Sequence, residues 1–175
     1  LSQSFVIKMF KTVKRKIDVN SSCEEVWSLM TSSGKLENYH PFCRSNEVLK
    51  WDAENSVDLI KYYNGKILKR SFYDWNDKSG YRLTINDMKK DIADVRWKIL
   101  TSDSDTTNLS IEIRVLDGAS MSYPRIINRI LLTFYVLPLL GSYLESVLKG
   151  FKYFIETGSS VSKNQFGNNS LFSNN

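Results

Sequence analysis

The chain has 175 residues, of which 42% are hydrophobic and 13% aromatic, and its formal net charge is +5. A chain of this size and composition forms one domain with a buried core, which excludes an intrinsically disordered protein. The charged residues carry no nucleic-acid-binding motif, the two cysteines have neither disulfide-framework nor zinc-site spacing, and no uncharged run reaches the roughly 20 residues that cross a bilayer. We therefore expect no nucleic-acid partner, no metal site, no spanning helix, and free thiols in a reducing cytoplasm.

The first predicted element is a strand over residues 12–19. Apolar and charged residues alternate there, which is typical of a half-buried strand whose apolar side carries Val13, Ile17 and Val19. Arg15 falls on the same side, where a charged group needs water or a partner. Two interpretations of Arg15 stay open: a side chain that reaches solvent from the strand, or a polar anchor inside a cavity.

Two short helices are predicted after this strand. Ser22 and Glu25 have the spacing of a capping box, in which each side chain binds the backbone N–H of the other, and an amphipathic helix follows them. One further helical turn is expected over residues 35–39. Pro41 disfavours helical geometry at His40 and returns the chain to an extended path.

A series of short strands is predicted in the middle of the chain. The β-prone runs are separated by turn signals such as the hairpin dipeptide Asn64-Gly65, and their alternation is clearest in the last two runs. The runs cover residues 46–51, 57–63, 66–75, 81–85, 93–100 and 109–115. Sequential hairpins of this number predict one strongly curved antiparallel sheet, and its concave side needs a cover.

The last predicted elements are helical. Residues 125–137 are apolar on nearly every side, which indicates a helix that is buried or faces lipid or ligand. Pro138 removes a helical hydrogen bond, so a kink or break is expected there. Residues 142–158 have apolar side chains at three-and-four spacing and a second capping-box pair beginning at Ser142, which predicts an amphipathic helix. The Ser- and Asn-rich residues 159–175 are predicted to be a disordered tail.

This order of elements resembles the START-like helix-grip superfamily (SRPBCC), which includes the birch pollen allergen and polyketide cyclase/dehydrase-like proteins. The stretches that carry the resemblance are residues 13–27, Tyr39-His40-Pro41, residues 95–99 (VRWKI) and residues 148–158 (LKGFKYFIETG). The resemblance implies an α+β fold, in which a curved seven-stranded antiparallel sheet wraps around a long C-terminal helix and two short helices follow the first strand. The chain then divides into a lead-in (1–11), one helix-grip domain (12–158) and the tail (159–175).

In that superfamily a pocket for an apolar small molecule lies between the sheet and the long helix, and the resemblance implies such a pocket here. Plain core packing stays open as the alternative for each wall residue, and strand alternation does not say whether Tyr62 or Tyr63 points inward. Arg70 and Arg82 are further polar candidates for orienting an anionic or carbonyl-bearing ligand. The expected ligand-binding residues are Tyr63, Tyr73, Trp75, Tyr81, Trp97, Phe151, Phe154 and Arg15.

The sequence contains no established catalytic grouping. It has one histidine and lacks the nucleophile elbow, the phosphate-binding loop and the dinucleotide fingerprint. We therefore predict a non-catalytic binder or carrier of a hydrophobic small molecule or lipid, without a cofactor. The alternative is a polyketide cyclase/dehydratase-like enzyme that uses the same cavity, with His40 as its weak acid–base candidate against a structural role. A further hypothesis is transient contact with a membrane surface through residues 125–140.

Overall fold

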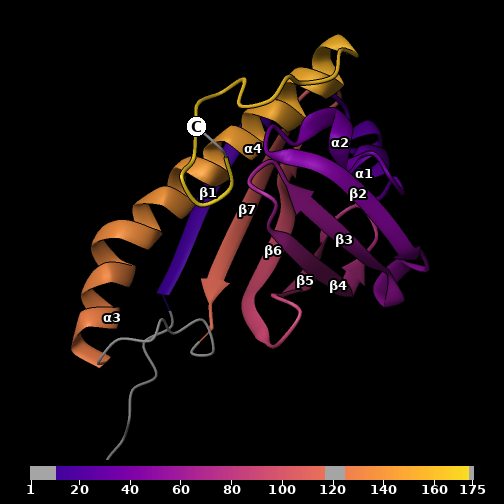
Figure 1. Cartoon of the computed structure of the whole chain (residues 1–175). Helices are drawn as coiled ribbons and strands as arrows, with labels where there is room; N and C mark the ends of the chain where they lie inside the picture. The colour runs from indigo at the N-terminus through magenta and orange to yellow at the C-terminus, as the bar shows by residue number, and fades with distance from the viewer. Residues whose placement is uncertain (1–10, 117–124, 174–175) are drawn as a thin grey trace, which may run out of the picture.

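The computed structural model describes residues 11–116 and 125–173 and contains one curved antiparallel sheet (Figure 1). Its seven strands follow the order β1-β7-β6-β5-β4-β3-β2, so β1 and β2 form the two edges. The strands are β1 (Lys11–Val19), β2 (Cys43–Lys50), β3 (Val57–Tyr62), β4 (Ile67–Asn76), β5 (Gly80–Asn86), β6 (Asp91–Ser102) and β7 (Thr107–Val115). Each predicted strand is present, with bounds that differ by a few residues.

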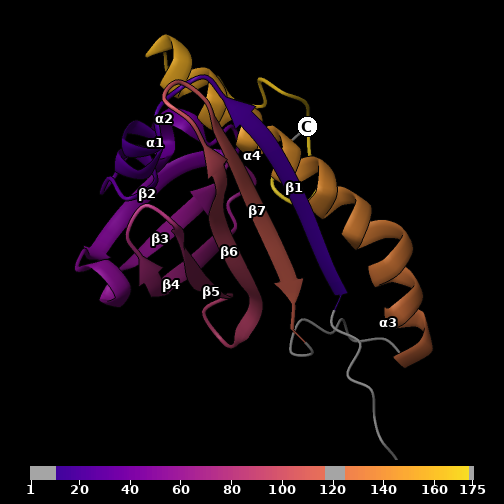
Figure 2. The ribbon, with the colours of Figure 1, turned by 180° about the vertical axis from the view of Figure 1, so that it is seen from behind.

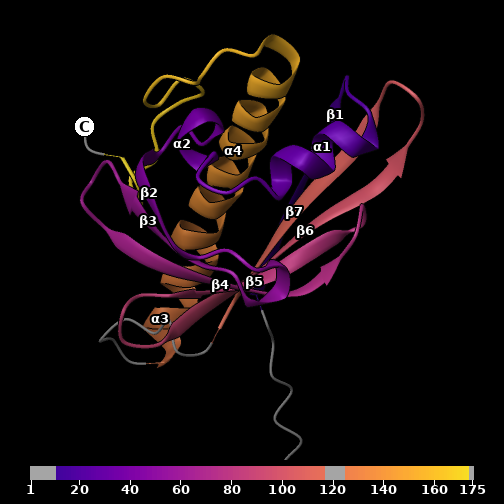
Figure 3. The same cartoon turned by 90° about the vertical axis from the view of Figure 1, so that its right-hand side faces the viewer.

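Helices cover the concave side of this sheet. The described helical segments are α1 (Cys23–Met30), α2 (Leu36–Tyr39), η1 (Ala53–Asn55), α3 (Arg125–Leu131), the π-helical turn η3 (Leu132–Val136) and α4 (Leu137–Thr157). The last three follow one another without a break and form one long rod beside β1 and β7 (Figures 1 and 2). α1 and α2 join the two edge strands and both contact α4 (Figure 3). The predicted architecture, a seven-stranded sheet around a long C-terminal helix, is confirmed.

Of the two predicted capping boxes, the structure contains the one at Ser22 and lacks the one at Ser142. Ser22 Oγ accepts the Glu25 N–H (3.3 Å) and Glu25 Oε2 accepts the Ser22 N–H (3.2 Å), which confirms the first capping box. The second is wrong, because α4 begins at Leu137 and the hydroxyl of Ser142 donates to a carbonyl of the same helix. Pro138 lies inside this continuous rod, so the expected break is absent, and the π-helical turn directly before it is the local irregularity.

The buried face of α4 lies against the sheet and against the corner that follows α2. Phe151 is fully buried, and its ring contacts Trp97 of β6 (centroids 5.8 Å apart) and Tyr39 of α2 (5.2 Å). Gly150 allows the close approach, because a Cβ at this position would lie 2.1 Å from the Tyr39 carbonyl oxygen. The position of the long helix at this point is therefore set by the packing of the Phe151 ring and by the close backbone approach that Gly150 allows.

The tail is not disordered over residues 159–173, which corrects the prediction. This segment folds back along α4 (Figure 1), and the N–H groups of Val161 and Asn164 donate to carbonyls of the α2 corner (2.9 Å each). Asn169 is 1% exposed and Phe172 is 7% exposed. These hydrogen bonds and buried side chains stabilise a segment of polar composition. The composition alone does not predict such contacts.

The helical rod leaves apolar side chains in solvent at its N-terminal end. The exposed ones are Ile127, Ile130, Phe134 and Tyr135 of α3 and η3. Over the two described stretches of the chain, the structure has no helix with both the length and the apolar character needed to cross a membrane. Contact of residues 125–140 with a membrane surface stays a prediction.

Replacing Gly150 with alanine tests the close contact between α4 and the α2 corner. We expect Gly150→Ala to lower the free energy of unfolding by about 1 to 3 kcal/mol, because the new methyl group meets backbone that cannot move aside cheaply. In the matched control, Gly141→Ala, the methyl group crowds the end of the flexible Arg15 side chain and makes an ordinary contact with Val13, so the variant keeps the helix-propensity gain of up to about 1 kcal/mol. Equal unfolding free energies for the two variants in urea denaturation would contradict this account.

Candidate ligand-binding site

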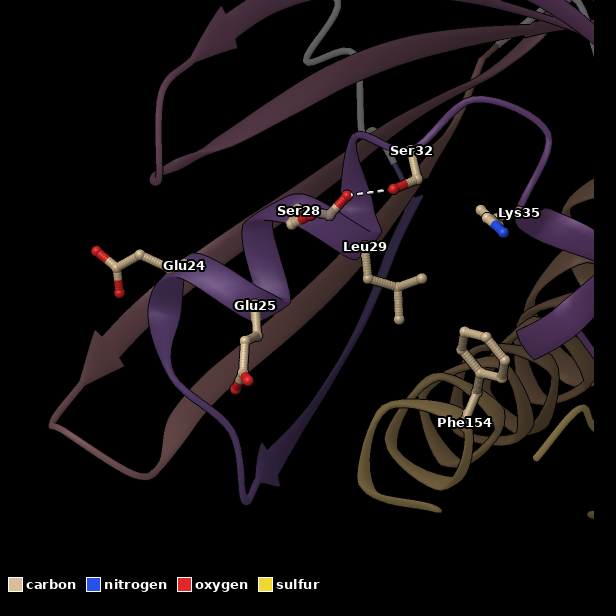
Figure 4. A pocket seen from close by; sticks show the side chains of 7 residues that line it. All are labelled: Glu24, Glu25, Ser28, Leu29, Ser32, Lys35 and Phe154. Carbon is tan, nitrogen blue, oxygen red and sulfur yellow. Dashed lines mark hydrogen bonds between the residues drawn. The ribbon is translucent and has the colours of Figure 1, made fainter. Parts of the chain in front are cut away.

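A groove of about 450 Å³ lies between α1 and the C-terminal part of α4 (Figure 4). Leu29 of α1 and Phe154 of α4 point toward one another across it (Figure 4). The remaining lining residues are polar: Glu24, Glu25, Ser28, Ser32 and Lys35. This volume is within the roughly 300 to 1,000 Å³ of small-molecule sites. The groove is open to solvent and more polar than most such sites, because only two of its seven lining residues are apolar.

The two carboxylates at the rim of the groove have hydrogen-bond partners, whereas the rim lysine has no ion pair in the described ranges. Glu24 accepts a hydrogen bond from Lys78 Nζ (2.9 Å), which lowers the pKa of that carboxyl. Glu25 is held by Ser21 and by the capping box, which lowers its pKa as well. Lys35 forms no ion pair within the described ranges, so it is the rim cation that remains available to an anionic group.

Behind α4, aromatic rings from several strands pack against one another. Trp97 contacts Tyr81 (6.5 Å between centroids), Tyr81 stacks on Trp75 (5.3 Å), and Trp27 of α1 contacts the last two. The structure thus brings four predicted residues together in one aromatic layer: Trp75, Tyr81, Trp97 and Phe151. Within this layer they make the ring contacts of a packed core, and Phe154 is the predicted residue that lines the groove.

One ion pair lies on the concave side of the sheet. Arg70 of β4 faces Asp58 of β3, and its Nε donates to Asp58 Oδ1 (2.7 Å), while Asn46 Nδ2 donates to Oδ2 (3.0 Å). The two charged side chains are 12% and 1% exposed. Burial opposes charge on Arg70, but the Asp58 carboxylate raises its pKa, so the guanidinium stays charged. Because of this ion pair, the Arg70 side chain mainly stabilises the fold.

His40 is enclosed, and its position favours the structural interpretation. Its Nδ1 accepts the Phe42 N–H (3.3 Å), so the proton lies on Nε2, which donates to Tyr143 Oη (2.9 Å). Tyr143 Oη in turn shares a hydrogen bond with Tyr62 Oη (3.0 Å). Burial lowers the pKa of His40 to about 3. The imidazole is therefore a neutral, fully hydrogen-bonded core group away from the groove.

Tyr63 and Arg15 lie outside this interior. Tyr62 points inward, and the half-buried Tyr63 instead has the Lys163 ammonium over its ring (5.3 Å to the centroid). Arg15 is exposed on the edge strand β1 with its guanidinium beside Gly141 of α4, so it reaches solvent from the apolar side. The polar-anchor interpretation of Arg15 is not supported.

Tyr73 also lies outside the interior, because it alternates with the buried Phe72, and a β-bulge after it turns Trp75 to the other side. The register of β4 and β5 shifts between Tyr73 and Asn76, and Asp74 has a φ of 51°. On the outer side, the Tyr73 hydroxyl donates to Asp94, the carboxylate that also pairs with Arg82 (2.7 Å). Burial and the Asp94 carboxylate together raise the pKa of Tyr73 to about 12.

The α1 side of the groove was absent from the expected site. Ser28 and the half-buried Leu29 lie on the short capped helix α1, whereas Ser32 and Lys35 lie in the connection to α2, and this pattern is that of any surface helix and the loop after it. The signal that could have found it is the neighbouring Phe154, a ring at the margin of the apolar stripe of α4. No cluster of metal-ligating side chains is present in the described parts of the chain.

No family model and no curated protein matches this sequence. Similar solved structures include a START superfamily protein from Mycobacterium smegmatis, with TM-score 0.65 and 14% identity over 85% of this chain and 99% of that one. The Zhui aromatase/cyclase from Streptomyces sp. R1128 has TM-score 0.61 and 14% identity, with coverages of 87% and 99%. Ara h 8.0201 has TM-score 0.58 and 9% identity, with coverages of 85% and 99%.

The chain has the START-like helix-grip fold. The expected resemblance is thereby confirmed for the architecture. At these identities, the helix-grip fold is what the chain shares with these proteins, and their ligands and activities are not transferred to it.

The enclosed state of His40 predicts how the protein responds to acid. The folded pKa is about 3 and the unfolded value is near 6.5, so the unfolded chain binds the additional proton between these pH values. The contribution of His40 to stability is therefore complete above pH 6.5 and is lost at about 1.4 kcal/mol per pH unit as the pH falls below it.

Because His40 is the single histidine of the chain, its ring signals can be followed by NMR without ambiguity. We expect no titration of its Cε1–H resonance between pH 8 and pH 5. A midpoint near pH 6.5 in the folded protein would show that the ring is solvated, contrary to the structure.

Proposed function

We propose that the protein binds a hydrophobic or amphipathic small molecule in the groove between α1 and α4. The observation that carries this proposal is the pair of apolar side chains, Leu29 and Phe154, that face one another beneath a polar rim (Figure 4). An aliphatic chain or a ring placed between them would lose its contact with water, which stabilises the complex roughly in proportion to the apolar area buried.

The polar rim favours a ligand with one anionic or carbonyl end. Glu24 and Glu25 are already hydrogen-bonded, whereas Lys35 has no carboxylate partner in the described ranges. A ligand that buries an apolar part against Phe154 therefore meets a cation at the mouth of the groove. Fatty acids and aromatic carboxylic acids have this combination of groups.

The helix-grip fold supports a binding function without specifying the ligand. Among the similar structures, one is described as a START superfamily protein and another as an aromatase/cyclase. Binding without catalysis is the better-supported choice, because His40, the expected acid–base residue, is buried at 4% exposure with both ring nitrogens hydrogen-bonded. It therefore has no open face toward the groove.

Fluorescence titration with N-phenyl-1-naphthylamine tests the groove. We expect one saturable site on the full chain, and we expect Phe154→Ser to weaken binding at least about tenfold, because it removes most of the apolar floor. The matched control is Phe134→Ser, which alters a phenyl ring that is 77% exposed at the other end of the helical rod. The absence of saturable binding, or an equal loss in the control, would overturn the proposal.

The role of Lys35 is tested with dodecanoate and dodecanol, which differ in the polar end. We expect Lys35→Met to weaken dodecanoate binding about two- to fivefold and to leave dodecanol unchanged, because an exposed ion pair contributes up to about 1 kcal/mol. Lys89→Met, at an exposed position in a distant turn, serves as the control for net charge. Equal effects of Lys35→Met on both ligands would show that the cation does not contact the carboxylate.

A further inference from the structure

Residues 159–173, here called the strap, run back along α4 after the helix ends. The strap begins beside α2, where Val161 donates to the Asn38 carbonyl (2.9 Å). It continues past Ser146, whose hydroxyl donates to the Phe166 carbonyl (3.2 Å), and reaches the N-terminal part of α4 at Asn169. Figure 3 shows the strap in yellow, passing α2 toward β2 and β3.

The strap ends with an aromatic ring held between two others. The centroid of the Phe172 ring lies 4.5 Å from that of Tyr62 and 4.4 Å from that of Tyr143, with tilts of 34° and 37°. Lys66 Nζ lies 5.0 Å from the centroid of the Phe172 ring, a cation–π distance. The ring is 7% exposed, so these neighbours enclose nearly all of it.

A hydrogen-bond acceptor is held directly beside this ring. The carbonyl oxygen of Leu171 accepts from Asn64 Nδ2 (2.9 Å) and from Lys66 Nζ (3.1 Å), both of the turn between β3 and β4. Tyr62, Tyr143, Asn64 and Lys66, here called the ring site, therefore recognise an aromatic ring and an adjacent oxygen acceptor together. A cation and an amide donor would bind a carboxylate at least as well as a peptide carbonyl.

The ring site is occupied by a residue of the strap rather than by a residue of a helix or strand, and this residue, Phe172, packs into the buried core. The strap has no regular secondary structure, and its other deep anchor is Asn169, whose amide donates to the Leu139 carbonyl (2.8 Å) and to Ser142 Oγ (3.1 Å). A tethered occupant of this kind competes with free ligands at an effective concentration in the millimolar range.

We propose that the ring site is a second binding site, which takes an aromatic ring bearing a carboxylate and which the strap closes by occupying it with Phe172 and the Leu171 carbonyl. The ring site shares no residue with the groove. Tyr143 and Phe154 are 11 positions apart in α4, about 16 Å along the helix axis. The strap is thus an internal competitor for a site that stands apart from the groove.

The test uses 3-phenylpropionate, which carries a phenyl ring and a carboxylate, and full-length variants that vacate the ring site. We expect Phe172→Ala to bind it at least about tenfold more tightly than the unmodified chain, because the competing ring is gone. Phe166→Ala is the matched control, since Phe166 lies in the strap but packs on Tyr153 (6.2 Å). It should bind no more tightly than the unmodified chain. Adding Lys66→Met to Phe172→Ala should weaken 3-phenylpropionate but not 3-phenylpropanol.

A second variant and a second measurement cover the case in which Phe172→Ala fails to fold. Asn169→Ala keeps the ring but releases its anchor, so it should also bind 3-phenylpropionate more tightly. In the unmodified chain, saturating 3-phenylpropionate should accelerate amide hydrogen exchange at residues 161–173, because ligand and strap exclude one another. Unchanged affinity in both variants, or slower exchange of the strap with ligand, would overturn the proposal. Groove binding of N-phenyl-1-naphthylamine is scored separately, so the two sites fail or succeed independently.

Discussion

The close contact between α4 and the corner after α2 determines where the long helix lies on the sheet. Gly150 lets the helix backbone approach the Tyr39 carbonyl, and Phe151 fills the space between Tyr39 and Trp97. Because α1 and α2 are joined to the two edge strands, this contact also sets the separation between α1 and the end of α4. Phe154, one turn beyond Phe151, is thereby placed opposite Leu29, and the groove follows from that placement.

The buried polar groups of the interior form hydrogen bonds with one another, and the groups that are available to a ligand lie at the edge of the core. The Asp58–Arg70 pair and the hydrogen bonds of His40 are enclosed, and removing one partner from such a group is costly because the other stays buried. These groups therefore specify the fold rather than a reaction. The groove and the ring site each combine an apolar surface with a cation at the protein margin, namely Lys35 and Lys66. The ring site also shares Tyr143 with the hydrogen bonds of His40.

Alternation and turn residues predicted the strands, and the Ser22 capping box predicted the start of α1, because these signals are local. The side of the sheet to which each strand residue points was less predictable. Tyr73 and Trp75 have the same parity in an unbroken strand, but the bulge at Asp74 turns them to opposite sides, and no local signal in the sequence announces it. The strap was missed because its stability comes from contacts of a few residues with distant elements. The groove was missed for the same reason, since it exists only when two helices meet.

The central claim is that a ligand lies between Leu29 and Phe154. Isotope-filtered NOE spectroscopy of the ¹³C-labelled protein with unlabelled dodecanoate tests it most directly, because each cross-peak reports a contact between a ligand proton and an identified side chain. The account predicts cross-peaks from the acyl chain to the Leu29 methyl groups and to the Phe154 ring. Cross-peaks confined to the exposed side chains of α3 and η3, or none at saturating ligand, would contradict it.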